Sequence, residues 1–254
     1  MGDTNGSTEV FGEPEAHERA RVAEACRALT HAGVLSGVLG HVSLRLEDGA
    51  LLVRSRGPDE QGLRFSRPGD VMKVDSDGDA LDDRSDVRAP NELPIHTAVM
   101  RRRPDVNAVV HAHPYHTLLV GIADLDLVPL VGAYNIPATR LAANDRIARF
   151  PRAALINDWE LASQLAANMG TRNACLLRGH GIVTCGATLE EAVITAVDLE
   201  QLCRVTIDVH RLGVAPRPIS DEDLTQLPDL GAAFNADMAY RALVASERAA
   251  STAG

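Results

Sequence analysis

Two histidines separated by one residue form the first pattern in the sequence that suggests chemistry. His111 and His113 lie at the end of residues 107–113, a run rich in β-branched side chains, and this composition predicts a strand. Side chains two positions apart on a strand project to the same side, so both imidazoles would face one site. Neutral imidazoles held in this way are good ligands for Zn²⁺ and neighbouring divalent metals. Taken alone, the pair also fits histidines that merely end a strand.

A third histidine favours the metal interpretation. His180 stands between Gly179 and Gly181, directly after the apolar segment 174–177. Glycines on both sides permit tight turns and a close approach to neighbouring backbone. Three histidine ligands with an open fourth position are typical of a catalytic rather than a structural metal site.

Glu92 is the fourth candidate for this site. It begins residues 92–103, where apolar side chains recur at helical spacing, and His96 follows one turn later. A carboxylate beside a metal can act as a further ligand or as a general acid/base. The helix dipole alone also favours a glutamate in a first turn, so the role of Glu92 stays open at this point. We expect His96 to be structural rather than a ligand.

These residues need a scaffold in which helices and strands alternate. Periodicity predicts helices at residues 17–32, 92–103, 158–169, 188–212 and 229–250, and strands at 42–46, 51–53, 71–75, 107–113, 174–177 and 182–185. Neither a repeat nor a linker interrupts this order. We expect a flexible tail at residues 1–15 and a single α/β domain at residues 16–250, with helices around a mostly antiparallel sheet.

Charge and composition exclude several classes of partner. The chain has 254 residues, with 25 Lys and Arg against 35 Asp and Glu and a net charge of −10. Such an acidic protein is a poor binder of nucleic acid or anionic membrane, so we expect neither as a partner. No segment resembles a signal peptide or a membrane span. The four scattered cysteines, at positions 26, 175, 185 and 203, fit buried thiols in a reducing compartment. We therefore expect a cytoplasmic protein.

Taken together, these motifs resemble the class II aldolase/adducin family. The resemblance rests on Glu92 with His96, on residues 103–113 and on residues 178–181, and it extends from about residue 17 to residue 213. It implies a three-layer α/β/α sandwich and a homotetramer with sites at subunit interfaces. It also implies that His111, His113 and His180 bind one divalent metal, with Glu92 as a ligand or an acid/base. Zinc is preferred, and manganese, iron or cobalt would also suit these ligands.

The residues expected around the substrate differ from those of the sugar-phosphate aldolases. Those enzymes hold phosphate with a Gly-Asn-x-Ser loop, a Thr-Gly turn and small hydroxyl residues before the glutamate. Here residues 40–43 read Gly-His-Val-Ser, residues 55–58 read Ser-Arg-Gly-Pro, and Pro-Asn precedes the glutamate. The first of these resembles a branch of decarboxylases that act on hydroxylated aromatic or pyridine dicarboxylates. We therefore expect Ser43, Arg56 and Gly57 to bind substrate, and His41 or Glu92 to supply a proton.

Arg56 illustrates how these substitutions suit a carboxylate. A guanidinium binds a planar carboxylate through two parallel hydrogen bonds, although a solvated charge on a strand is the alternative for this residue. A divalent metal and a few arginines would also give an acidic protein a local cationic pocket for a small anionic substrate.

The function predicted from these features is that of a metal-dependent carbon–carbon lyase. A metal chelated by two substrate oxygens would stabilise the electrons left when the bond breaks. We expect a decarboxylase of a small hydroxylated aromatic or related carboxylic acid. One alternative is a class II aldolase or epimerase acting on a non-phosphorylated hydroxy-carbonyl compound. A second alternative is an adducin-like, non-catalytic scaffold, which would bind no metal.

Overall fold

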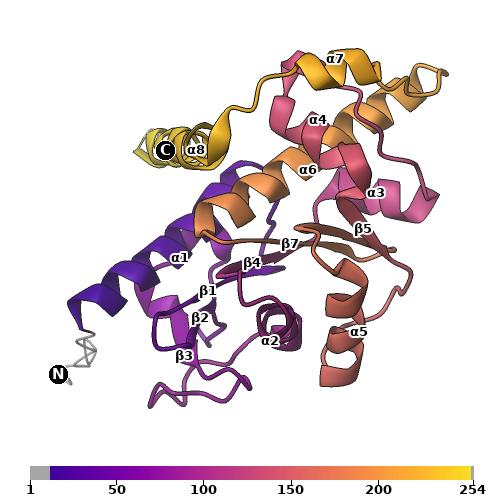
Figure 1. Ribbon diagram of the computed structural model, residues 1–254. Helices are drawn as coiled ribbons and strands as arrows, with labels where there is room; N and C mark the ends of the chain where they lie inside the picture. Colours follow the sequence, from indigo (N-terminus) through magenta and orange to yellow (C-terminus); the bar gives the residue numbers. More distant parts are fainter. Residues whose placement is uncertain (1–11, 253–254) are drawn as a thin grey trace.

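A mixed sheet forms the centre of the computed structural model, which describes residues 12–252 (Figure 1). Its seven strands lie in the order β3-β2-β1-β4-β7-β6-β5. All neighbouring strands are antiparallel except β5 and β6. The strands are β1 (His41–Arg45), β2 (Leu51–Arg54), β3 (Val71–Val74), β4 (Ala108–Ala112), β5 (Ile147–Phe150), β6 (Ala174–Leu177) and β7 (Gly181–Gly186).

Helices cover both faces of this sheet, as Figure 1 shows. One face carries α1, α3, α4, α6 and α8, and the other carries α2 and α5. Their bounds are α1 (Glu13–His31), α2 (Leu93–Arg102), α3 (Tyr115–Ala123), α4 (Ile136–Ala142), α5 (Trp159–Met169), α6 (Leu189–Arg211), α7 (Asp221–Gln226) and α8 (Ala239–Thr252). The predicted three-layer sandwich around a mostly antiparallel sheet is therefore confirmed.

Alternation along the central strands divides the interior into two apolar cores. On β4, Val110 packs toward α1 and α6, whereas Val109 packs toward α2 and α5. On β1, Val42 and Leu44 belong to the first core. The odd-numbered positions of β1 and β4 consequently face α2, because successive strand side chains point to opposite sides. His41, on β1, is one of them and faces the second layer of helices.

Several element boundaries differ from the sequence prediction. The expected tail at residues 1–15 is too long, because α1 begins at Glu13 with Pro14 in its first turn, where a missing backbone N–H costs nothing; residues 1–11 lie outside the described part. The predicted helix at residues 229–250 contains a π-helical segment (Ala233–Met238) before α8. Strand β5 and helices α3, α4 and α7 were not predicted, since their short sequences carry too few turns of periodicity.

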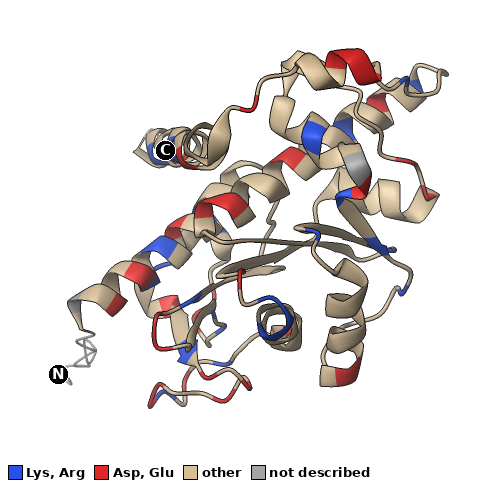
Figure 2. Ribbon diagram, viewed as in Figure 1, with Lys and Arg blue, Asp and Glu red and all other residues tan. Residues whose placement is uncertain are grey.

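The positions of the charged residues agree with the acidic composition of the chain. Figure 2 shows acidic residues along α1, α6 and α7, interspersed with Lys and Arg on α1 and α6. All four cysteines are buried and unpaired, in agreement with the expectation of buried thiols. Within residues 12–252, every helix is too short or too polar to span a lipid bilayer.

Candidate metal centre

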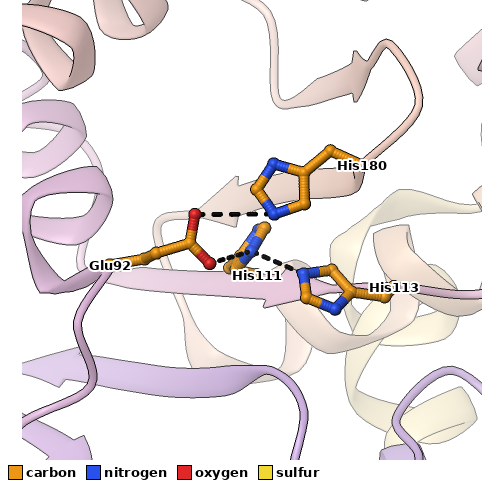
Figure 3. A group of neighbouring side chains, drawn as sticks. All are labelled: Glu92, His111, His113 and His180. Atoms are coloured by element: carbon orange, nitrogen blue, oxygen red, sulfur yellow. Dashed lines mark hydrogen bonds and ion pairs between the residues drawn. The ribbon is translucent and has the colours of Figure 1, made fainter. Parts of the chain in front are cut away.

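The His-x-His pair lies where β4 ends, on the side of the sheet covered by α2. His111 belongs to β4 and is fully buried, and His113 follows the strand. Their Nε2 atoms lie 3.0 Å apart. Because side chains two positions apart lie on the same side of the strand, both imidazoles meet at one point, as the spacing predicts (Figure 3).

The turn between β6 and β7 brings His180 to the same point. Gly179 has a φ of +60°, a conformation that side chains other than glycine rarely adopt. A Cβ atom on Gly181 would lie 2.1 Å from the carbonyl oxygen of Ala112. Only glycine therefore allows β7 to begin so close to the end of β4. The two glycines around His180 serve the close approach that the sequence suggested.

Glu92 reaches the three histidines from the N-terminal end of α2. It is the N-cap residue of the helix and is 5% exposed. Its Oε1 accepts a hydrogen bond of 2.9 Å from the backbone N–H of Ile156 and lies 3.5 Å from His180 Nε2. Its Oε2 lies 3.2 Å from His111 Nε2. Figure 3 shows the carboxylate facing His180 and His111, with His113 beyond His111.

The hydrogen bonding of His111 directs its Nε2 atom toward Glu92 and His113. His111 Nδ1 lies 2.9 Å from the carbonyl oxygen of Ile182, and a carbonyl can only accept, so Nδ1 carries the proton. His111 Nε2 then faces Glu92 Oε2 at 3.2 Å, and the lone pair that this nitrogen has in a neutral imidazole can bind a cation together with the carboxylate. A backbone partner on the other nitrogen is also the usual arrangement for a metal-ligating histidine.

The spacing of the four side chains suits a small divalent ion. Each offers one ligand atom, and these atoms all lie within 4.8 Å of one another. Four ligands at the usual zinc distances of about 2.0–2.1 Å would lie about 3.3 Å apart in a tetrahedron. The measured contacts of 3.0, 3.2 and 3.5 Å lie around this value. The group could therefore hold a divalent metal without rearrangement of the backbone.

Protonation states favour the same conclusion. Burial lowers the pKa of His113 to about 4, with His111 and His180 adding to the effect. Burial alone would raise the pKa of the Glu92 carboxyl, but the facing imidazoles of His111 and His180 outweigh it and hold that pKa well below its ordinary value. Near pH 7 His113 is thus neutral and Glu92 ionised, which are the forms that bind metals.

A second polar cluster lies on β1 and α2, beside the ligand group. His41 is opposite His111 in the strand register, and their ring centroids are 5.1 Å apart. His41 Nδ1 lies 2.7 Å from His96 Nε2, and His96 Nδ1 lies 2.5 Å from Ser43 Oγ. His96 therefore contacts its neighbours rather than the ligand group, in line with its expected structural place.

Two of the expected substrate residues lie elsewhere than the sequence suggested. Ser43 is fully buried and its hydroxyl contacts His96. The expectation that Ser43 binds substrate directly is therefore wrong, because β1 lies between β2 and β4 within the sheet. Gly57 lines a separate cavity of about 250 Å³ with Arg54, Glu60 and Arg84. That cavity contains none of the four grouped side chains.

Arg56 lies near enough to act on the site. Its Nη2 donates a hydrogen bond of 2.9 Å to the carbonyl oxygen of Val38. Its positive charge contributes to lowering the pKa of His41, behind the larger effects of burial and of His96 and His111. A positive charge of this kind at the edge of the site suits an anionic group of a ligand.

Two features of the site carried no clear sequence signal. The backbone N–H of Ile156 anchors Glu92, but it lies in an irregular segment before α5 whose path cannot be inferred from local pattern. The contacts of His96 were missed for a different reason. Its spacing from Glu92 placed it on the correct helix face, but only the sheet shows which strand residues meet that face.

Comparison with known families decides the classification. Residues 20–207 match the family described as Class II Aldolase and Adducin N-terminal domain. The chain belongs to the class II aldolase and adducin family. The predicted resemblance is thereby confirmed.

Among class II aldolase relatives, this chain is 43% identical over 233 residues to a 3,4-dihydroxyphthalate decarboxylase of Arthrobacter keyseri, covering 90% of this chain and 94% of the relative. It is 41% identical over 232 residues to the enzyme of the same name from a Terrabacter species, covering 91% and 97%. A crystal structure of an aldolase II superfamily protein from Pseudomonas syringae superimposes with a TM-score of 0.78 at 21% identity, covering 94% and 95% of the two chains. The predicted fold and enzyme class, a carbon–carbon lyase with decarboxylation preferred, are confirmed.

Proposed function

We propose that this class II aldolase family member is a metal-dependent decarboxylase of a vicinally dihydroxylated aromatic dicarboxylate. The first candidate substrate is 3,4-dihydroxyphthalate, the compound named for the relatives that match nine-tenths of this chain. The observation that carries the metal dependence is the convergence of Glu92, His111, His113 and His180, whose ligand atoms all lie within 4.8 Å of one another. The small anionic substrate agrees with the positive charge of Arg56 at the edge of the site.

In this proposal His111, His113 and His180 are the metal ligands, with Glu92 beside them. Zinc is the preferred ion because these are mainly nitrogen ligands at tetrahedral spacing, although manganese, iron and cobalt suit the same donors. When bound, the ion supplies Lewis acidity for the negative charge that develops on a substrate oxygen.

Glu92 is proposed to move one proton. Its ionised carboxylate takes the proton of a substrate hydroxyl and returns it to the ring carbon that bears the departing carboxylate. The carbon–carbon bond then breaks, CO₂ leaves, and its electron pair returns through the ring to the deprotonated hydroxyl oxygen. Water reprotonates that oxygen, so the reaction consumes one proton in total. The Ile156 N–H, 2.9 Å from Oε1, fixes the carboxylate for this transfer.

His41 and Arg56 are proposed to contact the substrate itself. His41 adjoins His111 across the strand pair, so it would meet an oxygen close to the metal. Arg56 would bind the carboxylate that is not lost. Gly57, next in sequence, is proposed to shape the same loop, and Ser43 to support His41 from behind.

The proposal extends to the organisation of the protein. We propose a single domain, predicted at residues 16–250 and extended back to Glu13 by α1, because Glu92, the strand β4 and the turn at His180 must converge on one site. A cytoplasmic location is favoured by the four buried unpaired thiols, which persist in reducing compartments. A homotetramer follows from the family resemblance.

The test is to incubate metal-replete protein with 3,4-dihydroxyphthalate and measure CO₂ release and the monocarboxylate product. We expect turnover that a chelator abolishes and that added metal restores. Absence of turnover on a panel of hydroxylated aromatic dicarboxylates, together with aldehyde release from a hydroxy-carbonyl compound, would overturn the decarboxylase in favour of an aldolase. A purified protein unable to bind metal would instead favour the scaffold.

A further inference from the structure

A chain of hydrogen bonds runs behind the metal centre, from Ser43 through His96 to His41. Ser43 Oγ lies 2.5 Å from His96 Nδ1, and His96 Nε2 lies 2.7 Å from His41 Nδ1. Ser43 and His96 are fully buried, and His41 is 3% exposed. These three side chains come from β1 and α2 and lie outside the group of four that could hold the ion. We call them the β1 histidine chain.

The protons of this chain can be arranged in two ways while both imidazoles are neutral. In the first arrangement Ser43 donates to His96 Nδ1, His96 donates from Nε2 to His41 Nδ1, and His41 carries its own proton on Nε2. In the second arrangement each of these bonds is reversed. His41 Nε2 is then an acceptor, and the hydrogen of the Ser43 hydroxyl needs another partner.

Burial of Ser43 distinguishes these arrangements. Within residues 12–252, Ser43 Oγ forms no other hydrogen bond, and the residue is 0% exposed, so water does not replace the missing acceptor. A buried hydroxyl hydrogen without an acceptor is unfavourable. The first arrangement pairs every donor in the chain and is therefore the one the structure favours.

The free end of the chain lies at the metal centre. His41 Nε2 has no hydrogen-bond partner in the described part of the protein, yet it is not one of the fully buried atoms that lack one. It is therefore accessible to a ligand. His41 is opposite His111 in the strand register, and their ring centroids lie 5.1 Å apart, so the His41 ring lies beside the metal ligands.

We propose that Ser43 and His96 are positioning residues that hold His41 in the tautomer protonated on Nε2, so that His41 presents a hydrogen-bond donor to a substrate oxygen. The hydrogen bond would strengthen as negative charge develops on that oxygen, which is how a preorganised donor stabilises a transition state. In this arrangement neutral His41 is not the proton donor to carbon, and that role falls to Glu92. The identity of the substrate oxygen rests on the proposed function, whereas the tautomer does not.

The first experiment measures the tautomer directly. Protein labelled with ¹⁵N-histidine and loaded with diamagnetic Zn²⁺ reports which ring nitrogens carry protons, and a His41→Gln variant assigns the His41 signals. We expect the His41 proton on Nε2 in the unchanged protein and a mixture of tautomers in Ser43→Ala. The control is Thr184→Val, which removes another buried strand hydroxyl, donated to the Ala192 carbonyl at 2.8 Å, and should leave the His41 signals unchanged.

The second experiment asks whether Ser43 acts through His96. Ser43→Ala should lower kcat about tenfold, the effect expected for one hydrogen bond, with KM and metal content nearly unchanged. In a His96→Phe background, which keeps a ring but removes both nitrogens, Ser43→Ala should have no further effect on kcat. A merely structural serine would instead reduce activity by the same factor in both backgrounds.

The outcomes separate this inference from the proposed function. A His41 proton on Nδ1 in the unchanged protein, or a Ser43→Ala variant with the same tautomer as the parent, would overturn the inference whatever the substrate proves to be. Additive effects of Ser43→Ala and His96→Phe on kcat would also overturn it. Absence of CO₂ release by the unchanged protein would contradict the proposed function and leave the tautomer measurement to decide the role of Ser43.

Discussion

The metal centre and the β1 histidine chain share the α2 face of the sheet but differ in what holds them together. In the chain, a proton can satisfy each contact, from Ser43 to His96 and on to His41. In the metal centre, Glu92, His111, His113 and His180 each offer a ligand atom, all within 4.8 Å of one another, an arrangement that a shared cation would hold together. The comparison teaches that residue type alone does not separate a ligand from a supporting histidine. What separates them is whether an imidazole nitrogen converges with other ligand atoms, as in the metal centre, or is paired within a hydrogen-bond chain, as in His96.

The largest effect is expected from removing a metal ligand. His180→Ala should lower metal content and reduce decarboxylation at least about a thousandfold, since the Lewis acid is lost. His31→Ala is the matched control, because His31 is exposed at the end of α1 and its Nε2 lies 2.9 Å from Ser246 Oγ, outside the group of ligand residues. Metal analysis and kcat on the same preparations test this. Full metal content and activity in His180→Ala would remove this residue from the ligand set.

Glu92→Gln separates the two roles that the sequence left open. It keeps the size of the side chain but removes the negative charge and the site that carries the proton. We expect kcat to fall at least about a hundredfold, a typical contribution of general acid–base catalysis, while more metal is retained than in His180→Ala. Metal loss equal to that of the histidine variant would show that Glu92 acts chiefly as a ligand.

Acid should weaken the fold through the β1 histidine chain as well as through the metal centre. Burial lowers the pKa of His96 to about 3, from a usual value of 6.5. Between these values the unfolded chain binds a proton that folded His96 does not, so stability falls as the pH falls from about 6.5 toward 3. In this range His96 lowers the free energy of unfolding by about 1.4 kcal/mol for each pH unit of acidification. Urea unfolding of the metal-loaded protein at pH 7, 6 and 5 measures it, and an unfolding free energy that stays constant or rises on acidification would contradict it.

The smallest effect is expected at the edge of the site. Arg56→Met removes a charge while keeping an unbranched side chain, and should raise KM about fivefold, in line with the energy of a partly exposed ion pair. The kcat and the metal content should change little. Arg56→Lys keeps the charge without the two parallel hydrogen bonds, so its KM should lie between those of the unchanged protein and Arg56→Met. A fall in kcat with KM unchanged would indicate that Arg56 acts on the reaction step instead.

Residue spacing predicted more of the metal centre than of the β1 histidine chain. The alternation of β4 sufficed to place His111 and His113 on one side, and the flanking glycines marked the turn that carries His180. The path of Ser43 was misjudged because a motif read along the chain does not show that β1 lies in the middle of the sheet, where α2 covers it. The same limit applies to the Ile156 anchor of Glu92, since an irregular segment has no period from which its position follows.

Elements were predicted best where they were long. Helices α1 and α6 have several turns of apolar periodicity and were found with small boundary errors. Strand β5 has four residues and pairs in parallel with β6, a non-local contact that its own sequence does not specify. The scaffold around the site was thus predictable, and the contacts that bind its parts together were not.

Metal titration with simultaneous measurement of CO₂ release tests the central claim most directly. Protein stripped of metal is titrated with Zn²⁺, and separately with Mn²⁺, in the presence of 3,4-dihydroxyphthalate. We predict that CO₂ release rises in proportion to bound metal and reaches its plateau at one ion per chain, as expected for a single ligand group of Glu92, His111, His113 and His180. Full CO₂ release by the stripped protein, or one bound ion per chain without CO₂ release, would contradict the account.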